Sequence, residues 1–141
     1  MDVPVDDGRC FACGPENPDG LHLQFERAGE RSVRARVTLA ETFQGWRNVA
    51  HGGIGMMLLD EAMAHAAAAA GFRGMTASMS LRFRAPVPLG EPLDLYGEVV
   101  WIRRNVLALR ATVKSGDALL LEGDGHFVAK GRLEDVADRR S

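Results

Sequence analysis

Hydrophobic and polar positions follow two different periods along this chain of 141 residues. Residues 32–39, "SVRARVTL", alternate between apolar and polar side chains, which predicts a half-buried strand. The segment from Gly53 to about Ala70 contains good helix formers and no proline, and Gly71 follows as a stop signal. Because apolar residues occupy every side of this expected helix, we expect it to be buried on most sides.

The period of two returns after Gly71. Residues 76–87, "TASMSLRFRAPV", place Met79 and Phe83 on one face of a predicted strand and Thr76 and Ser78 on the other. Residues 92–104 and 106–131 continue as long strands, with hairpin turns predicted at 103–105 and 115–118. One helix and one meandering sheet pack economically when the sheet curves around the helix. We therefore predict an α+β fold in which a curved antiparallel sheet wraps a long central helix.

Length and composition indicate one globular domain, with 46% hydrophobic and 26% charged residues and a net charge of −2. We divide the chain into an irregular lead-in (1–30), a folded domain (31–133) and a solvated tail (134–141). No basic stripe predicts a nucleic-acid partner. Acids in the middle of the apolar helix argue against a membrane span, and the first residues lack the build of a signal peptide. A cytoplasmic protein is expected.

Cys10 and Cys13 form the single CxxC of the sequence. Zinc needs four ligands, or three and a water, but no second CxxC or histidine pair follows, and His22 stands alone. A redox CxxC usually lies where a strand meets a helix N-terminus, whereas this pair lies among prolines and glycines. A structural or incidental role is preferred over metal binding and redox chemistry. We expect no metal and no cofactor.

The stretch "HGG" at residues 51–53 precedes the predicted helix. Gly52 and Gly53 let the backbone approach a ligand closely, and the free N–H groups of a helix N-terminus favour negative charge. An oxyanion developing on a thioester carbonyl suits such a position. Asp60 lies about 12 Å further along the helix, at 1.5 Å per residue. Both groups can serve one carbonyl only if a second subunit supplies one of them.

Two adjacent acids, Asp60 and Glu61, interrupt the apolar helix. An ionised carboxylate in apolar surroundings is costly unless it is satisfied, so a functional role is expected for Asp60. Glu61 has His65 four residues later on the same helix face, which predicts that it is solvated or faces this histidine. Asp60 is therefore expected to carry the chemistry and Glu61 is not.

Most of the chain resembles the hotdog-fold acyl-CoA thioesterases, in the branch that includes phenylacetate-pathway and mitochondrial thioesterase-superfamily proteins. The resemblance rests on "CGPENPDGLHL", "FQGWRNVAHGGIGMMLLDEAM", "TASMSLRFRAPVPLGEP" and the strand-rich end. It implies hydrolysis of an acyl-CoA without a cofactor. It also implies a homodimer or homotetramer with active sites at the subunit interface.

The resemblance assigns roles to four residues. Asp60 is the nucleophile or general base, and the N–H of Gly52 polarises the thioester carbonyl. His51 shapes the loop and contacts the thioester region. Thr76, sixteen residues after the acid, matches a hydroxyl that orients the attacking water.

The chain departs from many relatives at Gly45, where they carry Asn or Gln. Gln44 and Asn48 flank this position, and either is a candidate for the missing polar contact. Arg82 and Arg84 are candidates for binding coenzyme A phosphates, although strand arginines are usually solvated.

Simpler interpretations stand beside these roles. Gly52 and Gly53 also permit close helix–sheet packing, and Thr76 also suits a strand start. Two other functions remain open: a hotdog hydratase or dehydratase that uses His51 and Asp60 for proton transfer, and a non-catalytic domain that senses acyl-CoA.

Overall fold

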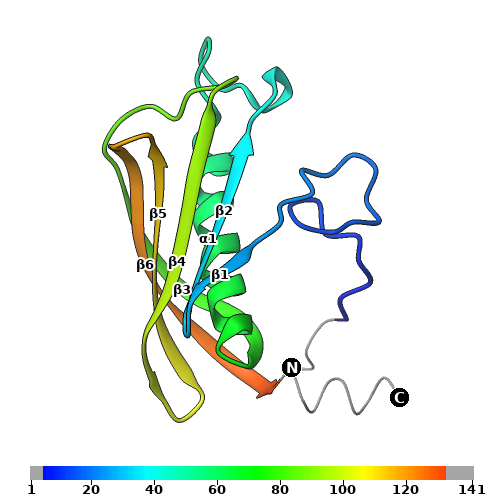
Figure 1. Cartoon of the computed structure of the whole chain (residues 1–141), viewed down its shortest axis with the longest axis vertical. Helices are drawn as coiled ribbons and strands as arrows, with labels where there is room; N and C mark the ends of the chain where they lie inside the picture. The colour runs from blue at the N-terminus through cyan, green and yellow to red at the C-terminus, as the bar shows by residue number, and fades with distance from the viewer. Residues whose placement is uncertain (1–4, 133–141) are drawn as a thin grey trace.

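In the computed structural model, which describes residues 5–132, one long helix lies against a single curved sheet (Figure 1). In chain order the elements are β1 (Glu26–Gly29), β2 (Ser32–Thr38), the 3-10 turn η1 (Glu41–Phe43), α1 (Gly52–Ala69), β3 (Phe72–Phe83), β4 (Pro92–Arg103), β5 (Val106–Ser115) and β6 (Ala118–Arg132). Six antiparallel strands follow the order β1-β2-β4-β5-β6-β3. This confirms the predicted hotdog arrangement. No helix in the described range is long and apolar enough to cross a membrane.

Helix α1 begins and ends where local signals place it. His51 is the N-cap residue, and the chain leaves the helix through Gly71, whose φ of 93° is readily adopted only by glycine. Leu58, Leu59 and Met63 are fully buried against the sheet. Met56, in contrast, is 41% exposed. The expectation that the helix is buried on most sides is confirmed, because only Gly52, Gly53 and Met56 of residues 52–69 are exposed.

The lead-in is more ordered than the sequence predicted. Strand β1 lies within residues 1–30 and pairs with β2, so the sheet starts before residue 31. Ala12 and Leu23 are buried in the core, and Leu23 N–H donates a 2.9 Å hydrogen bond to the carbonyl of Ala12. The segment before β1 thus packs on the domain. The domain boundary at residue 31 stays a prediction, and the tail (134–141) lies outside the described residues.

Candidate functional site

A β-bulge in β3 sets the position of Thr76. The ladder with β6 pairs Thr76 with Phe127 and Ser78 with His126, which leaves Ala77 as the extra residue. A bulge reverses the alternation of side chains beyond it. Thr76 therefore points to the helix, although the sequence pattern placed it on the same face as Ser78. This prediction of the strand face was wrong at Thr76.

The bulge brings Thr76 to Asp60. The Thr76 hydroxyl donates a 2.6 Å hydrogen bond to Asp60 Oδ1. Asp60 is half-buried and Thr76 is exposed, so the pair lies at the edge of the core with access to solvent. An ionised carboxylate in apolar surroundings needs a partner that satisfies it. Thr76 is such a partner, and it leaves the second carboxylate oxygen available for chemistry.

At the N-terminus of α1, the imidazole of His51 acts as a helix cap. Its Nδ1 accepts a 2.9 Å hydrogen bond from Gly53 N–H, and its carbonyl accepts from Ile54 N–H. Gly52 is the first helical residue, so its N–H has no intrahelical acceptor. His51, Gly52 and Gly53 are all exposed. A ligand carbonyl can therefore reach the Gly52 N–H, whereas the Gly53 N–H already has a partner.

The loop before the helix is held by its own hydrogen bonds. Gln44 Oε1 accepts from Asn48 N–H at 3.2 Å, and Asn48 adopts a positive φ of 61°. Gly45 packs so closely on His51 that an added Cβ would lie 2.9 Å from the His51 Cα. Gly45 is therefore required by the fold of this loop, and the larger Asn or Gln of relatives does not fit without a shift.

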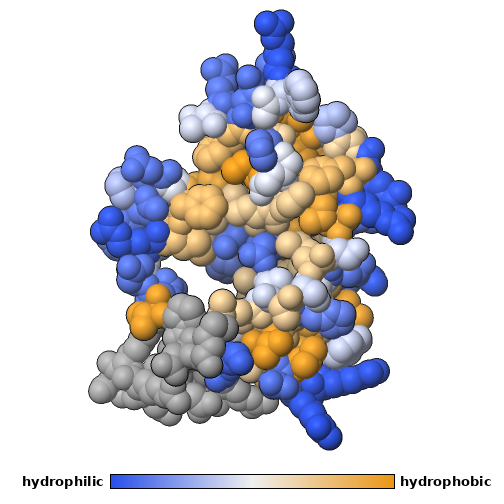
Figure 2. Space-filling model, turned by 180° about the vertical axis from the view of Figure 1, so that it is seen from behind, coloured by the Kyte–Doolittle hydropathy of each residue, from blue (hydrophilic) through white to orange (hydrophobic). Residues whose placement is uncertain are grey.

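A hollow of about 520 Å³ adjoins the helix N-terminus. It is lined by Trp46, Gly52, Phe83 and Arg84 together with neighbouring residues of two loops. Trp46 is 85% exposed and Phe83 is 46% exposed. Figure 2 shows that apolar side chains gather on the face of the molecule turned away in Figure 1. Asp60 does not line this hollow, so one chain does not bring together the two predicted ends of the catalytic site.

The two candidate arginines have different surroundings. Arg84 Nη2 donates a 2.7 Å hydrogen bond to Glu122 Oε1 across the sheet, while lining the hollow at Gly52. Arg82 is exposed and is paired in the ladder with Glu122. Phosphate binding at Arg84 thus has to compete with an existing ion pair.

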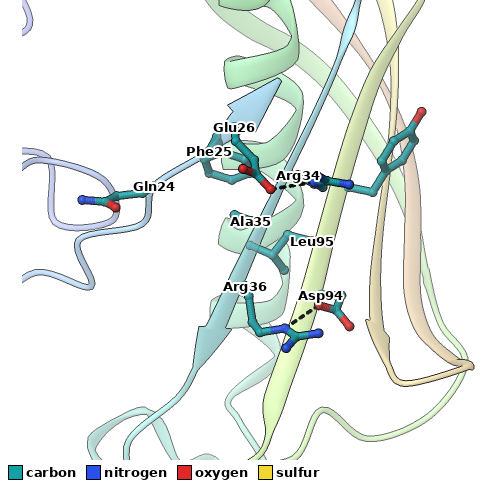
Figure 3. Close-up of a pocket in the computed structure, with 9 residues that line it drawn as sticks. Gln24, Phe25, Glu26, Arg34, Ala35, Arg36, Asp94 and Leu95 are labelled. Carbon is teal, nitrogen blue, oxygen red and sulfur yellow. Dashed lines mark hydrogen bonds and ion pairs between the residues drawn. The ribbon is translucent and has the colours of Figure 1, made fainter. Parts of the chain in front are cut away.

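A larger hollow, of about 720 Å³, lies beside β1, β2 and β4 (Figure 3). Its charged groups are already paired: Arg34 with Glu26 at 2.7 Å and Arg36 with Asp94 at 2.9 Å. The carboxylate of Asp94 raises the pKa of Arg36. None of the candidate site residues lines this hollow, so we do not place the active site there.

The fold also assembles a cluster that was not expected from the sequence. Cys10, Cys13 and Glu61 place their ligand atoms within 4.8 Å of one another. The predicted contact between Glu61 and His65 is confirmed, with 3.4 Å between Oε2 and Nε2. Burial, followed by the nearby Glu61 carboxylate, raises the pKa of the Cys13 thiol. The CxxC was visible in the sequence, but its contact with Glu61 joins residues fifty-one positions apart.

Solved structures resemble this fold closely. A crystal structure of a thioesterase-superfamily protein is 33% identical over 86% of this chain, with a TM-score of 0.81. This chain spans 63% of that relative's length. A hypothetical thioesterase from Streptococcus pneumoniae, solved with coenzyme A, is 17% identical over 78% of this chain and 90% of its own, with a TM-score of 0.73. Two further structures are variants of the S. pneumoniae protein in which a threonine or an aspartate is replaced by alanine.

The PaaI protein of Escherichia coli, from its phenylacetic acid degradation operon, is 17% identical over 79% of this chain and 82% of its own, with a TM-score of 0.73. At such identities the S. pneumoniae and E. coli structures show likeness of fold alone. No curated protein matches the chain significantly. The family model of the thioesterase superfamily matches residues 47–122, which include the helix, Asp60, Thr76 and the glycines at the helix N-terminus. This protein therefore belongs to the thioesterase superfamily.

Proposed function

We propose that this protein hydrolyses acyl-CoA thioesters to a free acid and coenzyme A, with Asp60 as the catalytic carboxylate. The observation that carries this proposal is the 2.6 Å hydrogen bond between Thr76 and Asp60. It fixes a carboxylate at a solvent-accessible edge of the largely apolar helix α1. No basic side chain of the described residues forms an ion pair with Asp60, so the charge is not part of a structural salt bridge.

Two substitution variants of the S. pneumoniae protein support this pair. The aspartate and threonine replaced in that protein are sixteen positions apart in its own chain. Asp60 and Thr76 have the same separation. The S. pneumoniae protein was also solved with coenzyme A, which supports the same class of substrate here.

We propose a homodimer, alone or as half of a tetramer, as the functional unit. Strand β3 is twelve residues long and is an edge strand of the sheet in one chain. Long exposed edges invite pairing with another strand. Pairing through β3 would make two sheets continuous and would cover exposed Met56 and Met75. It would also bring Asp60 near Gly52 of the partner subunit, which overcomes the separation of about 12 Å within one helix.

In this site the thioester carbonyl accepts a hydrogen bond from the Gly52 N–H. The Thr76 hydroxyl donates a hydrogen bond to Asp60, so its lone pairs are free to accept a hydrogen bond from a water molecule. This arrangement favours attack by water over direct attack by Asp60. Asp60 takes one proton as the water oxygen bonds to the carbonyl carbon. The tetrahedral intermediate then collapses and the carbon–sulfur bond breaks. The leaving coenzyme A sulfur takes the proton that Asp60 holds, which leaves free coenzyme A thiol, the acid and an ionised Asp60.

The remaining candidates are proposed to position the substrate. Gln44 holds the loop through its contact with Asn48, so we assign the polar contact of the relatives to the Asn48 side chain. Gly53 allows close approach of the acyl-CoA, and Arg82 and Arg84 bind its phosphates. His51 uses Nδ1 as a helix cap, which favours a role in shaping the loop over proton transfer. This disfavours the hydratase alternative, in which the imidazole would exchange protons with substrate.

The test is release of free thiol from a panel of acyl-CoAs, with Asp60→Asn as the variant. Removing a general base should lower kcat by about 100-fold or more and change binding much less. Asp124→Asn is a matched control, because its carboxylate lies on the surface with a side chain 70% exposed. Binding of acyl-CoA without turnover would favour the sensor, and hydration of an enoyl-CoA would favour the hydratase.

A further inference from the structure

The segment before β1 brings two cysteines against the middle of α1. Cys10 Sγ lies 4.0 Å from Glu61 Oε1, and the ligand atoms of Cys10, Cys13 and Glu61 lie within 4.8 Å of one another. All three residues are partly buried, and neither cysteine is in a disulfide. The hydrolysis proposed above uses none of them. Two thiols and a carboxylate at one point form a donor set without an assigned role.

The backbone around the cysteines has the form of a tight turn that presents both sulfurs to one side. Cys13 N–H donates to Cys10 Sγ at 3.5 Å, and Gly14 N–H donates to the Cys10 carbonyl at 2.8 Å. Gly14 is buried, and an added Cβ there would collide with the backbone of Cys10 and Gly8. Such N–H···S contacts stabilise negative charge on a sulfur, and two cysteines separated by two residues have the spacing of zinc ligands.

Glu61 completes the set from the helix. Its side chain is 15% exposed, and Oε2 has no hydrogen-bond partner among residues 5–132. His65 Nε2 lies 3.4 Å from this oxygen, and the imidazole stacks on Phe25 with ring centroids 4.4 Å apart. Burying a carboxylate beside two ionisable thiols is unfavourable unless a cation or hydrogen bonds compensate. A divalent cation among the three ligands would satisfy them together.

We propose that Cys10, Cys13 and Glu61 bind a structural zinc ion, with a water molecule as the fourth ligand. Zinc lies about 2.3 Å from thiolate sulfur and about 2.0–2.2 Å from carboxylate oxygen, so the ligand atoms of a tetrahedral site lie about 3.5–3.8 Å apart. The observed spread needs only small side-chain rotations to reach this value. Both thiols lose their protons when the metal binds. His65 Nε2 lies 3.4 Å from Glu61 Oε2, so a small movement of the ring would let it donate to this oxygen while Oε1 binds the metal, as partners of metal-bound carboxylates commonly do.

This inference replaces the expectation of no zinc. That expectation arose because too few ligands lie close to the CxxC in the sequence. The fold brings Glu61, fifty-one residues after Cys10, to both cysteines. The metal would fasten the lead-in to α1 at the residue next to Asp60. The inference does not depend on the proposed hydrolysis, because it rests on a different set of side chains.

The first experiment uses the wild-type chain purified under reducing conditions without chelator. Elemental analysis should find about one zinc per chain. After the metal is removed, cobalt(II) should bind and produce the charge-transfer absorption of cobalt–thiolate bonds. Zinc should also slow alkylation of both cysteines and raise the melting temperature. These measurements need no variant, so they remain decisive if a substitution prevents folding.

Variants then identify the ligands. Cys10→Ser and Cys13→Ser should each abolish the cobalt–thiolate band, and Glu61→Gln should weaken zinc affinity by about tenfold or more. His22→Gln is the matched control, because this exposed histidine belongs to the same segment. Asp60→Asn should bind zinc normally while losing thioesterase activity, so the two proposals fail separately.

Three results would overturn the site: no cobalt–thiolate band with fully reduced protein, zinc binding that survives both cysteine substitutions, or a disulfide between Cys10 and Cys13 that forms while zinc is present.

Discussion

The hydrogen bond between Thr76 and Asp60 predicts strong coupling between substitutions of these two residues. Thr76→Val removes the hydroxyl and keeps the branched shape of the side chain. Asp60→Asn removes the charge and keeps the size. If Thr76 acts only through Asp60 and the water between them, the double variant should be little worse than Asp60→Asn alone.

The magnitude follows from the geometry. A hydrogen bond to a charged group contributes about 1.5–3 kcal/mol, and Thr76 is exposed, so the lower end applies. A loss of about 1.4 kcal/mol corresponds to a tenfold lower kcat for Thr76→Val. Asp60→Asn should lose about 100-fold or more. Independent effects would multiply to about 1,000-fold in the double variant, whereas coupled effects should leave it near 100-fold.

The assay is thiol release at saturating acyl-CoA, using a substrate chosen from the panel for high turnover. Thr76→Ser keeps the hydroxyl and should retain most of the activity of the wild type. Circular dichroism checks that each variant is folded. Losses that multiply in the double variant would refute the reasoning, because Thr76 would then contribute independently of Asp60.

Three further predictions concern packing, assembly and substrate binding. Gly97→Ala should lower the free energy of unfolding, measured in urea, by about 1–3 kcal/mol, because the new Cβ would collide with the Ala62 carbonyl. Gly131→Ala is the control and should be close to neutral, because no atom lies within 4 Å of its added Cβ. Sedimentation should find a dimer or tetramer, and a stable monomer with full activity would exclude an interface site. Arg82→Ala and Arg84→Ala should each raise KM for acyl-CoA by about fivefold, because an exposed ion pair contributes roughly 1 kcal/mol. KM for a truncated thioester without phosphates should not change. An equal rise in KM for both substrates would contradict phosphate binding.

The elements with strong local signals were predictable from the sequence. The helix was expected from Gly53 to about Ala70 and runs from Gly52 to Ala69. Both hairpin turns lie where they were predicted, since strands β4 to β6 have clear alternation and turn residues between them. Strand β1 was missed because its four residues, "ERAG", are all exposed and carry no apolar alternation. Only its pairing with β2 makes it a strand.

Candidate site residues could be named from the sequence, but the geometry of the contact between Asp60 and Thr76 could not be predicted. Strict alternation along β3 put Thr76 on the outer face, and the bulge at Ala77 reversed this. No residue in the local sequence marks that bulge, because the register of β3 depends on its pairing with β6. The contact of Glu61 with Cys10 was equally hidden, because it depends on how the lead-in packs on the helix.

The positions of Asp60 and Glu61 explain why two adjacent acids interrupt an apolar helix. Neighbouring residues on a helix point about 100° apart. Asp60 therefore meets Thr76 on β3, whereas Glu61 meets Cys10 of the lead-in and His65 of its own helix. The helix is apolar on its other sides because the sheet covers one of them and, in the proposed dimer, a second subunit covers another. Asp60 thus lies where α1 meets the edge strand of the sheet, and Glu61 lies where α1 meets the lead-in. It follows that loosening the lead-in would act on the helix one residue from Asp60, the proposed catalytic carboxylate.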